Sequence, residues 1–215
     1  MSNKIITPTG GRPEAIANLN DYLTRQTFQD FEWIILDDVE PHGHAPSRCD
    51  HYIVADWVWN GENTQSKAVA RLLQEVIDSD KVLICEDDDW YSPHYVEKMI
   101  KALNNADIVG EKNAIYYNVN NYTYRHCGNT KHASLCSTGV TKTGIERLRK
   151  STNNKWIDME LWKSGGQLLS TRDSLGIKGM PGRVGIGVGH DMVATPDPNH
   201  EFLKSIIGDD ARRYV

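Results

Sequence analysis

Short apolar segments alternate with amphipathic ones over the first 110 residues. The apolar segments that predict strands are Lys4–Thr7, Trp33–Leu36, Tyr52–Val54 and Lys81–Cys85. Helical periodicity over Glu14–Gln26 and Gln65–Asp78 predicts helices between them, with Thr64 as a cap of the second. Pro8 is expected to end the first strand. Because parallel strands need crossover helices, this order predicts a doubly wound α/β core.

The pattern changes in the second half of the chain. Further elements are predicted as a helix from Pro93 to Asn104, a strand at Asp107–Gly110, antiparallel strands over Ala114–Arg125, a strand at Ser134–Val140, and helices at Lys142–Lys150 and Ile157–Lys163. The expected result is an α/β fold with a mixed sheet flanked by helices. Glycines crowd Ile177–Gly189, which favours a backbone that approaches a ligand.

Length and composition restrict the class of protein. The chain has 215 residues, 39% of them hydrophobic, and a formal charge of -5, which predicts a single domain. No apolar run is long enough for a bilayer, and the first residues lack the apolar core of a signal peptide, so we expect a cytoplasmic protein without a membrane partner. The four cysteines form no CxxC pair and are expected to be reduced thiols.

Charge divides the chain into two parts. Residues 1–110 carry 9 basic and 19 acidic side chains, a net charge of -10, whereas residues 111–190 carry 12 basic and 5 acidic ones, a net charge of +7. If the basic side chains gather on one face, they can attract an anionic partner. The alternative is that they are solvated side chains on loops.

Four carboxylates, Glu86 to Asp89, directly follow the apolar strand that ends at Cys85. Ligands bind at the carboxyl ends of strands in open α/β sheets. Carboxylates at this spacing repel one another unless a cation neutralises them, and oxygen ligands favour Mn²⁺ or Mg²⁺ over Zn²⁺. The alternative, a solvated acidic turn, is disfavoured by the buried strand before the cluster and by Trp90 and Tyr91 after it.

The segment ICEDDDWYSPHYVEKM resembles the metal-binding segment of the GT-A nucleotide-sugar glycosyltransferases of family 2, written D-x-D-D-x-x-x-P. The order of strand, Thr-Pro-Thr loop, helix and strand ending in Asp-Asp is similar to that family over residues 4–105. The resemblance implies a single GT-A domain. Residues 1–110 would bind the nucleotide sugar, and residues 111–215 would bind the acceptor and supply the glycine-rich loop.

The resemblance also implies donor-binding residues. Pro8, Thr9 and Arg12 match the first loop, which holds the nucleotide. Asp37 and Asp38 match the acids at a strand end, one of which binds uracil in relatives. A UDP-sugar, with UDP-glucose as the first choice, is the implied donor.

The acidic segment and the next helix complete the implied donor site. Lys67 falls on the helix that passes near the diphosphate. Glu86 replaces the first Asp of the motif, Asp87 is placed to reach the ribose, and Asp88 matches the main metal ligand. Helix capping and surface turns are the structural alternatives for these residues.

Three later residues complete the implied machinery. WIDMELW resembles the segment whose Asp is the general base, which assigns that role to Asp158, although Ile157 replaces the usual Glu. An N-cap is the alternative for Asp158, and without a base a retaining mechanism would be open. The resemblance implies that Arg183 stabilises the departing diphosphate and that His190 completes the metal shell; a structural histidine is the alternative for His190.

The segments HASLCSTG and KGMPGR…GIGVGH are similar to those of short bacteriophage-encoded glycosyltransferases. Some of these modify hydroxymethylated pyrimidines in DNA, so modified DNA is one expected acceptor and a host cytoplasm the expected location. A saccharide or other small acceptor is the alternative. A metal-dependent nuclease or phosphatase and a non-catalytic nucleic-acid-binding module are rival functions that use the same carboxylates or the same basic side chains.

Overall fold

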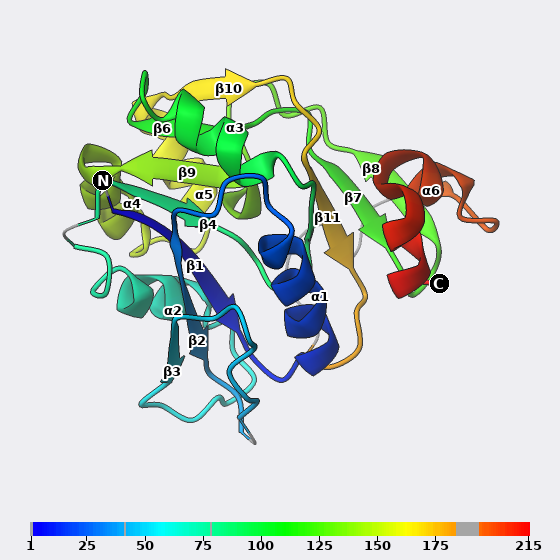
Figure 1. Cartoon of the computed structure of the whole chain (residues 1–215), viewed down its shortest axis with the longest axis horizontal. Coiled ribbons are helices and arrows are strands. Elements are labelled where there is room, and N and C mark those ends of the chain that lie inside the picture. Colours follow the sequence, from blue (N-terminus) through cyan, green and yellow to red (C-terminus); the bar gives the residue numbers. More distant parts are fainter. Residues whose placement is uncertain (1, 41, 78, 184–193) are drawn as a thin grey trace.

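The protein contains a seven-stranded mixed sheet in the strand order β10-β6-β9-β4-β1-β2-β3 (Figure 1). The computed structural model describes residues 2–40, 42–77, 79–183 and 194–215. The strands of this sheet are β1 (Asn3–Thr9), β2 (Glu32–Asp37), β3 (His51–Val54), β4 (Lys81–Ile84), β6 (Ile108–Glu111), β9 (Thr138–Thr141) and β10 (Gln167–Leu169). β1 pairs in parallel with β2 and β4, so their carboxyl ends meet at one edge.

A second sheet of five strands has the order β12-β8-β7-β11-β5. Its strands are β5 (Trp90–Tyr91), β7 (Ile115–Asn118), β8 (Thr123–His126), β11 (Ser174–Lys178) and β12 (Thr195–Pro196). β7 pairs antiparallel with β8 and parallel with β11, and β11 pairs antiparallel with β5. In the view of Figure 1, β7, β8 and β11 lie on one side of helix α1, and β1 to β3 lie on the other.

Helices cover both faces of the larger sheet. They are α1 (Pro13–Thr24), α2 (Gln65–Leu72), α3 (Tyr95–Ala102), α4 (Lys142–Ser151), α5 (Ile157–Leu161) and α6 (Glu201–Ile207), with 3₁₀ turns at Leu135–Ser137, Trp162–Ser164 and Gly208–Arg213. Alternate residues of β2 face opposite sides: Trp33 and Ile35 pack with α1 and α3, and Ile34 packs with α2 and α4. Burial on both faces explains the unbroken apolar runs in the sequence.

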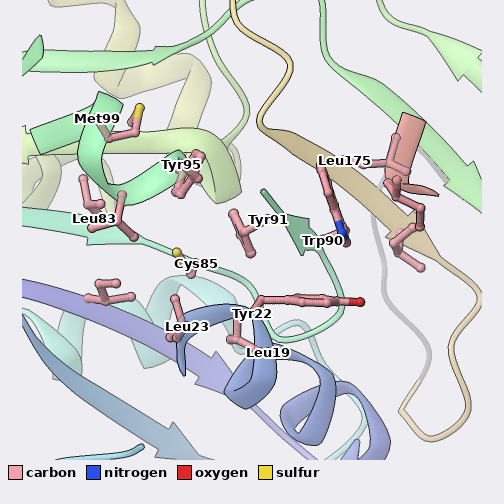
Figure 2. Close-up of a cluster of buried hydrophobic side chains, with 14 of the residues drawn as sticks. Leu19, Tyr22, Leu23, Leu83, Cys85, Trp90, Tyr91, Tyr95, Met99 and Leu175 are labelled. Atoms are coloured by element: carbon pink, nitrogen blue, oxygen red, sulfur yellow. The ribbon is translucent and has the colours of Figure 1, made fainter. Parts of the chain in front are cut away.

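The core shared by the two sheets holds the acidic segment in place (Figure 2). Cys85, before the cluster, and Trp90 and Tyr91, after it, belong to the same buried group as Tyr22 of α1 and Leu175 of β11. The Trp90 Nε1–H donates to Asp210 Oδ2 over 2.7 Å, which ties this segment to the C-terminal turn. The acidic residues therefore lie on a short link anchored at both ends.

The fold confirms the predicted α/β class, the mixed sheet and the antiparallel pair within residues 114–125. The chain has two sheets where one was expected. No helix in the described part of the chain is long and apolar enough to cross a membrane.

Several element boundaries differ from the prediction. β1 continues through Pro8 because the Thr9 carbonyl still accepts a bond from the Asp38 N–H over 3.1 Å. α2 ends at Leu72, beyond which hydrogen bonds span three residues and tighten the chain into turns. The predicted strand at Ser134–Val140 begins with a 3₁₀ turn, and only Thr138–Thr141 is extended. β5, β10, β11, β12 and α6 were not predicted.

Candidate active site

The acidic cluster, defined here as Glu86 to Asp89, links β4 to β5 at the carboxyl end of the parallel strands. Asp87, Asp88 and Asp89 are 2%, 7% and 1% exposed, and Glu86 is half-buried. Burial of carboxylates at this density costs free energy unless positive charge lies close by. The alternative of a solvated surface turn is therefore wrong, and the partners of these carboxylates decide what the cluster can do.

The loop between β1 and α1 supplies the first partners. The Thr9 hydroxyl donates to Asp87 Oδ2 over 2.6 Å. Arg12 Nη1 donates to Asp88 Oδ2 over 2.6 Å and lies 3.3 Å from Asp87 Oδ1. The structure therefore brings four of the predicted donor-site and metal-site residues together.

Lys178, at the end of β11, is a second buried cation beside the cluster. Its Nζ lies 3.5 Å from Asp89 Oδ1 and 3.9 Å from Asp88 Oδ2, and its side chain is 12% exposed. The Ile177 N–H also donates to Asp89 Oδ1, over 2.8 Å. Lys178 was not among the predicted residues; a single Lys at the end of a short apolar run gives no local signal of this role.

Burial and charge set the protonation of the cluster. Burial, reinforced by the charge of Asp89, raises the pKa of Glu86 to about 8. Burial also raises the pKa of Asp87, to about 6, despite Arg12. The pKa of Asp88 shifts in the opposite direction. Lys178 and Arg12 outweigh the effect of burial and hold this pKa below the ordinary value. Asp88 is thus the carboxylate most strongly kept in its charged form.

The donor set fits a divalent cation. When all four carboxylates are ionised, they exceed Arg12 and Lys178 by two negative charges, which one divalent ion would neutralise. Asp89 Oδ2 is buried and has no hydrogen-bond partner among the described residues. Ligand atoms of Glu86, Asp89 and Cys136 lie within 4.8 Å of one another. The two carboxylates of this group are ligands that Mn²⁺ and Mg²⁺ prefer, whereas the Cys136 thiol is a softer ligand.

A second pair of carboxylates, Asp37 and Asp38, follows β2 and is 3% exposed at each residue. Neutral donors hold Asp37: the Tyr52 hydroxyl donates to Oδ2 over 2.5 Å, and the Gly43 N–H donates to the same atom over 2.9 Å. The Val39 N–H donates to Oδ1 over 3.3 Å. Asp37 therefore shapes the loop that follows β2.

Arg183 pairs with Asp38. Its Nη1 donates to Asp38 Oδ1 over 2.6 Å, its Nη2 donates to the Thr64 hydroxyl over 2.7 Å, and its guanidinium lies 4.8 Å from the centre of the Trp59 ring. The Thr64 hydroxyl in turn donates to Asp38. Thr64 is the N-cap residue of α2, as predicted, but its side chain makes no capping hydrogen bond to the helix.

Glycine permits this contact. A Cβ atom at Gly10 would lie 2.9 Å from Arg183 Nη1 and would also overlap Asp38 Oδ1, so only glycine leaves room for the pair. Gly182 has a φ of +106°, and a Cβ there would strike the Gly11 carbonyl. The glycine-rich segment therefore packs closely on the loop between β1 and α1, as far as Arg183.

Asp158 lies elsewhere, in a cavity of about 720 Å³. Glu86 and Lys178 line the same cavity, as do Trp156 and the loop 127–132. Asp158 is the second residue of α5, where Trp156 is the N-cap, so the capping alternative is wrong. Its Oδ1 accepts the Met159 N–H over 2.9 Å, and burial raises its pKa above the ordinary 3.8 despite the nearby His132.

The remaining predicted residues are placed as follows. Pro8 is half-buried in β1, next to Thr9. Lys67 is exposed on α2, with its ammonium 4.1 Å from the centre of the Trp57 ring. His190 lies outside the described residues. Besides Lys178, the prediction missed Gln65, whose Nε2 donates to Glu86 Oε1 over 2.8 Å.

Comparison with known proteins agrees with this arrangement. Residues 4–162 match the model of glycosyl transferase family 2. An uncharacterized glycosyltransferase, YwdF of Bacillus subtilis (strain 168), is 26% identical over 157 residues, which cover 68% of this chain and 58% of that protein. The chain thus spans less than two thirds of that relative.

Solved structures show the same fold. TarS 1-349 of S. aureus in complex with UDP-GlcNAc superposes with a TM-score of 0.59 at 14% identity, over 96% of this chain and 65% of that one. The mannosyltransferase PcManGT of Pyrobaculum calidifontis, in complex with GDP-Man and Mn²⁺, gives a TM-score of 0.56 at 13% identity, over 83% of this chain and 57% of that one. The family match covers the acidic cluster and Asp158, and the GT-A fold agrees with it. The chain therefore belongs to glycosyl transferase family 2.

Proposed function

We propose that the protein transfers a sugar from a UDP-sugar, with UDP-glucose as the first choice, to an acceptor hydroxyl. The observation that carries this proposal is the cavity that Glu86 of the acidic cluster shares with Asp158. Asp158, the proposed base, therefore lines the same cavity as Glu86, at the end of the proposed donor site. The complexes of TarS with UDP-GlcNAc and of PcManGT with GDP-Man support a nucleotide-sugar donor.

Residues 1–110 form the proposed donor half. Thr9 and Arg12 bind the nucleotide together with Pro8, Asp37 and Asp38, and Arg183 joins them through its pair with Asp38. Lys67, Glu86 and Asp87 are proposed to contact the diphosphate and the ribose. Residues 111–215 are the proposed acceptor half, and the loop 127–132 and the start of α5 form its wall of the cavity.

Asp88 is the proposed ligand of a Mn²⁺ or Mg²⁺ ion, with His190 completing the shell. When bound, the ion supplies Lewis-acid stabilisation of the diphosphate. Arg12 Nη1 donates a hydrogen bond to Asp88 Oδ2 in the structure. We propose that this bond breaks when the ion binds and that the Arg12 guanidinium then donates to the phosphates. The Mn²⁺ in the PcManGT complex supports a divalent ion.

Asp158 is the proposed general base. Its raised pKa makes it a stronger base than an ordinary Asp. The acceptor oxygen attacks the anomeric carbon while Asp158 takes its proton, and the diphosphate leaves on the opposite face. The expected product is the inverted glycoside.

A saccharide hydroxyl is the acceptor that the cavity supports best. Its volume of about 720 Å³ accommodates sugar rings, and Trp156 is 44% exposed on its wall, where an indole can stack on a ring. Five of the twelve basic side chains in residues 111–190 pair with carboxylates within the described structure; they are Arg147, Arg149, Lys163, Lys178 and Arg183. Ion pairing of these five side chains reduces the positive charge that a single basic face could present.

Modified DNA is a second candidate acceptor. Lys131 and Lys155 line the cavity beside Trp156, and neither pairs with a carboxylate in the described part of the chain. A hydroxymethylated pyrimidine stacked on Trp156 would place its phosphates near these cations. Transfer to DNA should then fall steeply with salt, because counterions are released on binding. A cytoplasmic location remains a prediction of the sequence.

The test is UDP release from UDP-sugars with Mn²⁺, measured with and without acceptor. We expect release with a saccharide acceptor that far exceeds hydrolysis, and preference for UDP-glucose among the donors. Hydroxymethylated DNA, unmodified DNA and the free nucleoside are run in parallel. Absence of release from every nucleotide sugar would refute the proposal, and transfer to modified DNA alone would establish the second candidate.

A further inference from the structure

Lys178 is a buried cation for which the mechanism above has no role. It lies outside residues 4–162, the part of the chain that matches the family model. An ammonium at 12% exposure is retained only where negative charge compensates its loss of hydration. The carboxylates of Asp88 and Asp89 supply that negative charge, and an ammonium beside such partners is charged at neutral pH.

The ammonium is only loosely held by these carboxylates. A charged N–H···O bond is usually about 2.7–2.9 Å long. Lys178 Nζ lies 3.5 Å from Asp89 Oδ1 and 3.9 Å from Asp88 Oδ2, and its other close contact among the described residues is the Tyr116 ring at 5.3 Å. An ammonium has three N–H donors. Most of its hydrogen-bonding capacity is thus free for a ligand.

Its position sets it apart from the two arginines. Lys178 lines the cavity that contains Glu86 and Asp158, whereas neither Arg12 nor Arg183 does. Arg183 makes two short bonds to Asp38 and Thr64, and Arg12 makes one to Asp88. Lys178 is the cation that borders both the acidic cluster and the space where acceptor and donor sugar would meet.

We propose that Lys178 is a further catalytic residue, whose ammonium stabilises the diphosphate as it leaves the donor sugar. This inference rests on the proposed function. The acceptor oxygen forms a bond to the anomeric carbon, and the bond from that carbon to the β-phosphate oxygen breaks. Its electron pair stays on the diphosphate, which gains one negative charge, and the acceptor proton goes to Asp158. Lys178 keeps its protons throughout.

The charge difference between UDP-sugar and UDP gives a test that does not depend on turnover. A cation that serves the leaving group binds UDP, with its extra charge, more strongly than the UDP-sugar. In Lys178→Met, UDP affinity by calorimetry with Mn²⁺ should fall about tenfold or more. Affinity for the UDP-sugar should fall less than threefold, and affinity for UMP, which lacks the β-phosphate, should not change.

Kinetics supply the second readout. Lys178→Met should lower kcat by about 10²-fold, in line with the loss of one preorganised electrostatic contact, with donor KM nearly unchanged. Lys178→Arg, which keeps the charge, should recover most of the loss. Lys98→Met is the matched control: Lys98 pairs with buried Asp173 over 2.7 Å and lies away from the cavity.

The Mn²⁺ affinity of Lys178→Met distinguishes a catalytic role of Lys178 from a purely structural one. Removing a neighbouring positive charge leaves the cluster more negative, so Lys178→Met should bind Mn²⁺ as tightly as the wild type or more tightly, by electron paramagnetic resonance. Weaker Mn²⁺ binding with equal losses for UDP, UDP-sugar and UMP would overturn the proposal and leave Lys178 as a structural counter-ion.

A neutral substitution at Lys178 that folds is needed for this comparison. If Lys178→Met does not fold, Lys178→Gln gives the same comparison, and full kcat in either neutral variant would overturn the proposal. Wild-type turnover is measured in the same assay, so its absence would mark failure of the proposed function itself. Normal wild-type turnover with an unaffected neutral variant would reject the role of Lys178 alone.

Discussion

Two groups of carboxylates follow parallel strands in this protein, and their partners differ. Asp37, after β2, accepts bonds from a hydroxyl and two backbone N–H groups, and its neighbour Asp38 pairs with Arg183. The acidic cluster after β4 is held instead by Arg12 and Lys178. The first group thus has one cation and several neutral donors for its two carboxylates, whereas the cluster, when its four carboxylates are ionised, exceeds its two cations by two negative charges. Equal positions in the fold thus give one group that is satisfied by its own partners and one that is suited to a further cation.

The largest effect is expected for Asp88→Asn, which tests whether the acidic cluster binds a cation. Asparagine keeps the shape but removes the charge that holds a hard divalent ion, so we expect kcat to fall by about 10³-fold or more and UDP binding to lose its dependence on Mn²⁺. Steady-state kinetics and calorimetry measure both. Asp209→Asn, at a 94% exposed side chain, is the control. Full activity of Asp88→Asn would contradict the assignment of a catalytic cation site to the acidic cluster.

A further carboxylate, Asp158, belongs to neither group but lines the same cavity as Glu86. Asp158→Asn should lower kcat by about 10³-fold, as for a general base, while donor affinity stays the same. Glu160→Gln is the control on the same helix, where Glu160 pairs with Lys163. A drop in donor affinity in place of kcat would assign Asp158 to binding.

The pH profile tests the same residue. A base acts in its deprotonated form, so activity should rise with pH through the pKa of Asp158. Burial raises that pKa above 3.8, so the acidic limb of kcat should have its midpoint above this value. Loss of this limb in Asp158→Asn would identify its origin. An unchanged limb in the variant would point to another group.

Arg183→Ala tests whether the cation beside the first group serves binding or catalysis. Since its guanidinium is bound to Asp38 and Thr64, we expect donor KM to rise about tenfold and kcat to change less than threefold. Arg149→Ala, which breaks the surface pair with Glu146, is the control. A fall of 10²-fold in kcat would instead give Arg183 the leaving-group role that the sequence resemblance implied.

The smallest effect is expected at Asp37. Loss of one recognition hydrogen bond is worth about 1 kcal/mol, so Asp37→Asn should reduce the preference for UDP over ADP by roughly fivefold in calorimetry. Tyr52→Phe removes a partner of Asp37 but keeps the carboxylate, and should have a smaller effect. Equal affinity of the wild-type protein for UDP and ADP would contradict a recognition role at this strand end.

The sequence by itself determined the α/β core and the acidic cluster. Runs such as Trp33–Leu36 are buried on both faces of a parallel sheet, and this burial is visible as unbroken hydrophobicity. The acidic segment and Asp158 each lie within one short stretch of chain, so their motifs are local. Most elements up to α5 that depend on local periodicity were predicted correctly, apart from their ends, whereas β11 and α6 were missed.

Tertiary structure alone decided which side chains meet. Thr64 could only be predicted as a helix cap, because nothing near it in the chain reveals that Asp38 and Arg183 converge on its hydroxyl. β5 has two residues and forms only because β11 pairs with it, more than 80 residues later in the chain. The same strand carries Lys178 to the acidic cluster. A contact between segments so far apart depends on the packing of the two sheets, and a single sequence does not encode it in any local pattern.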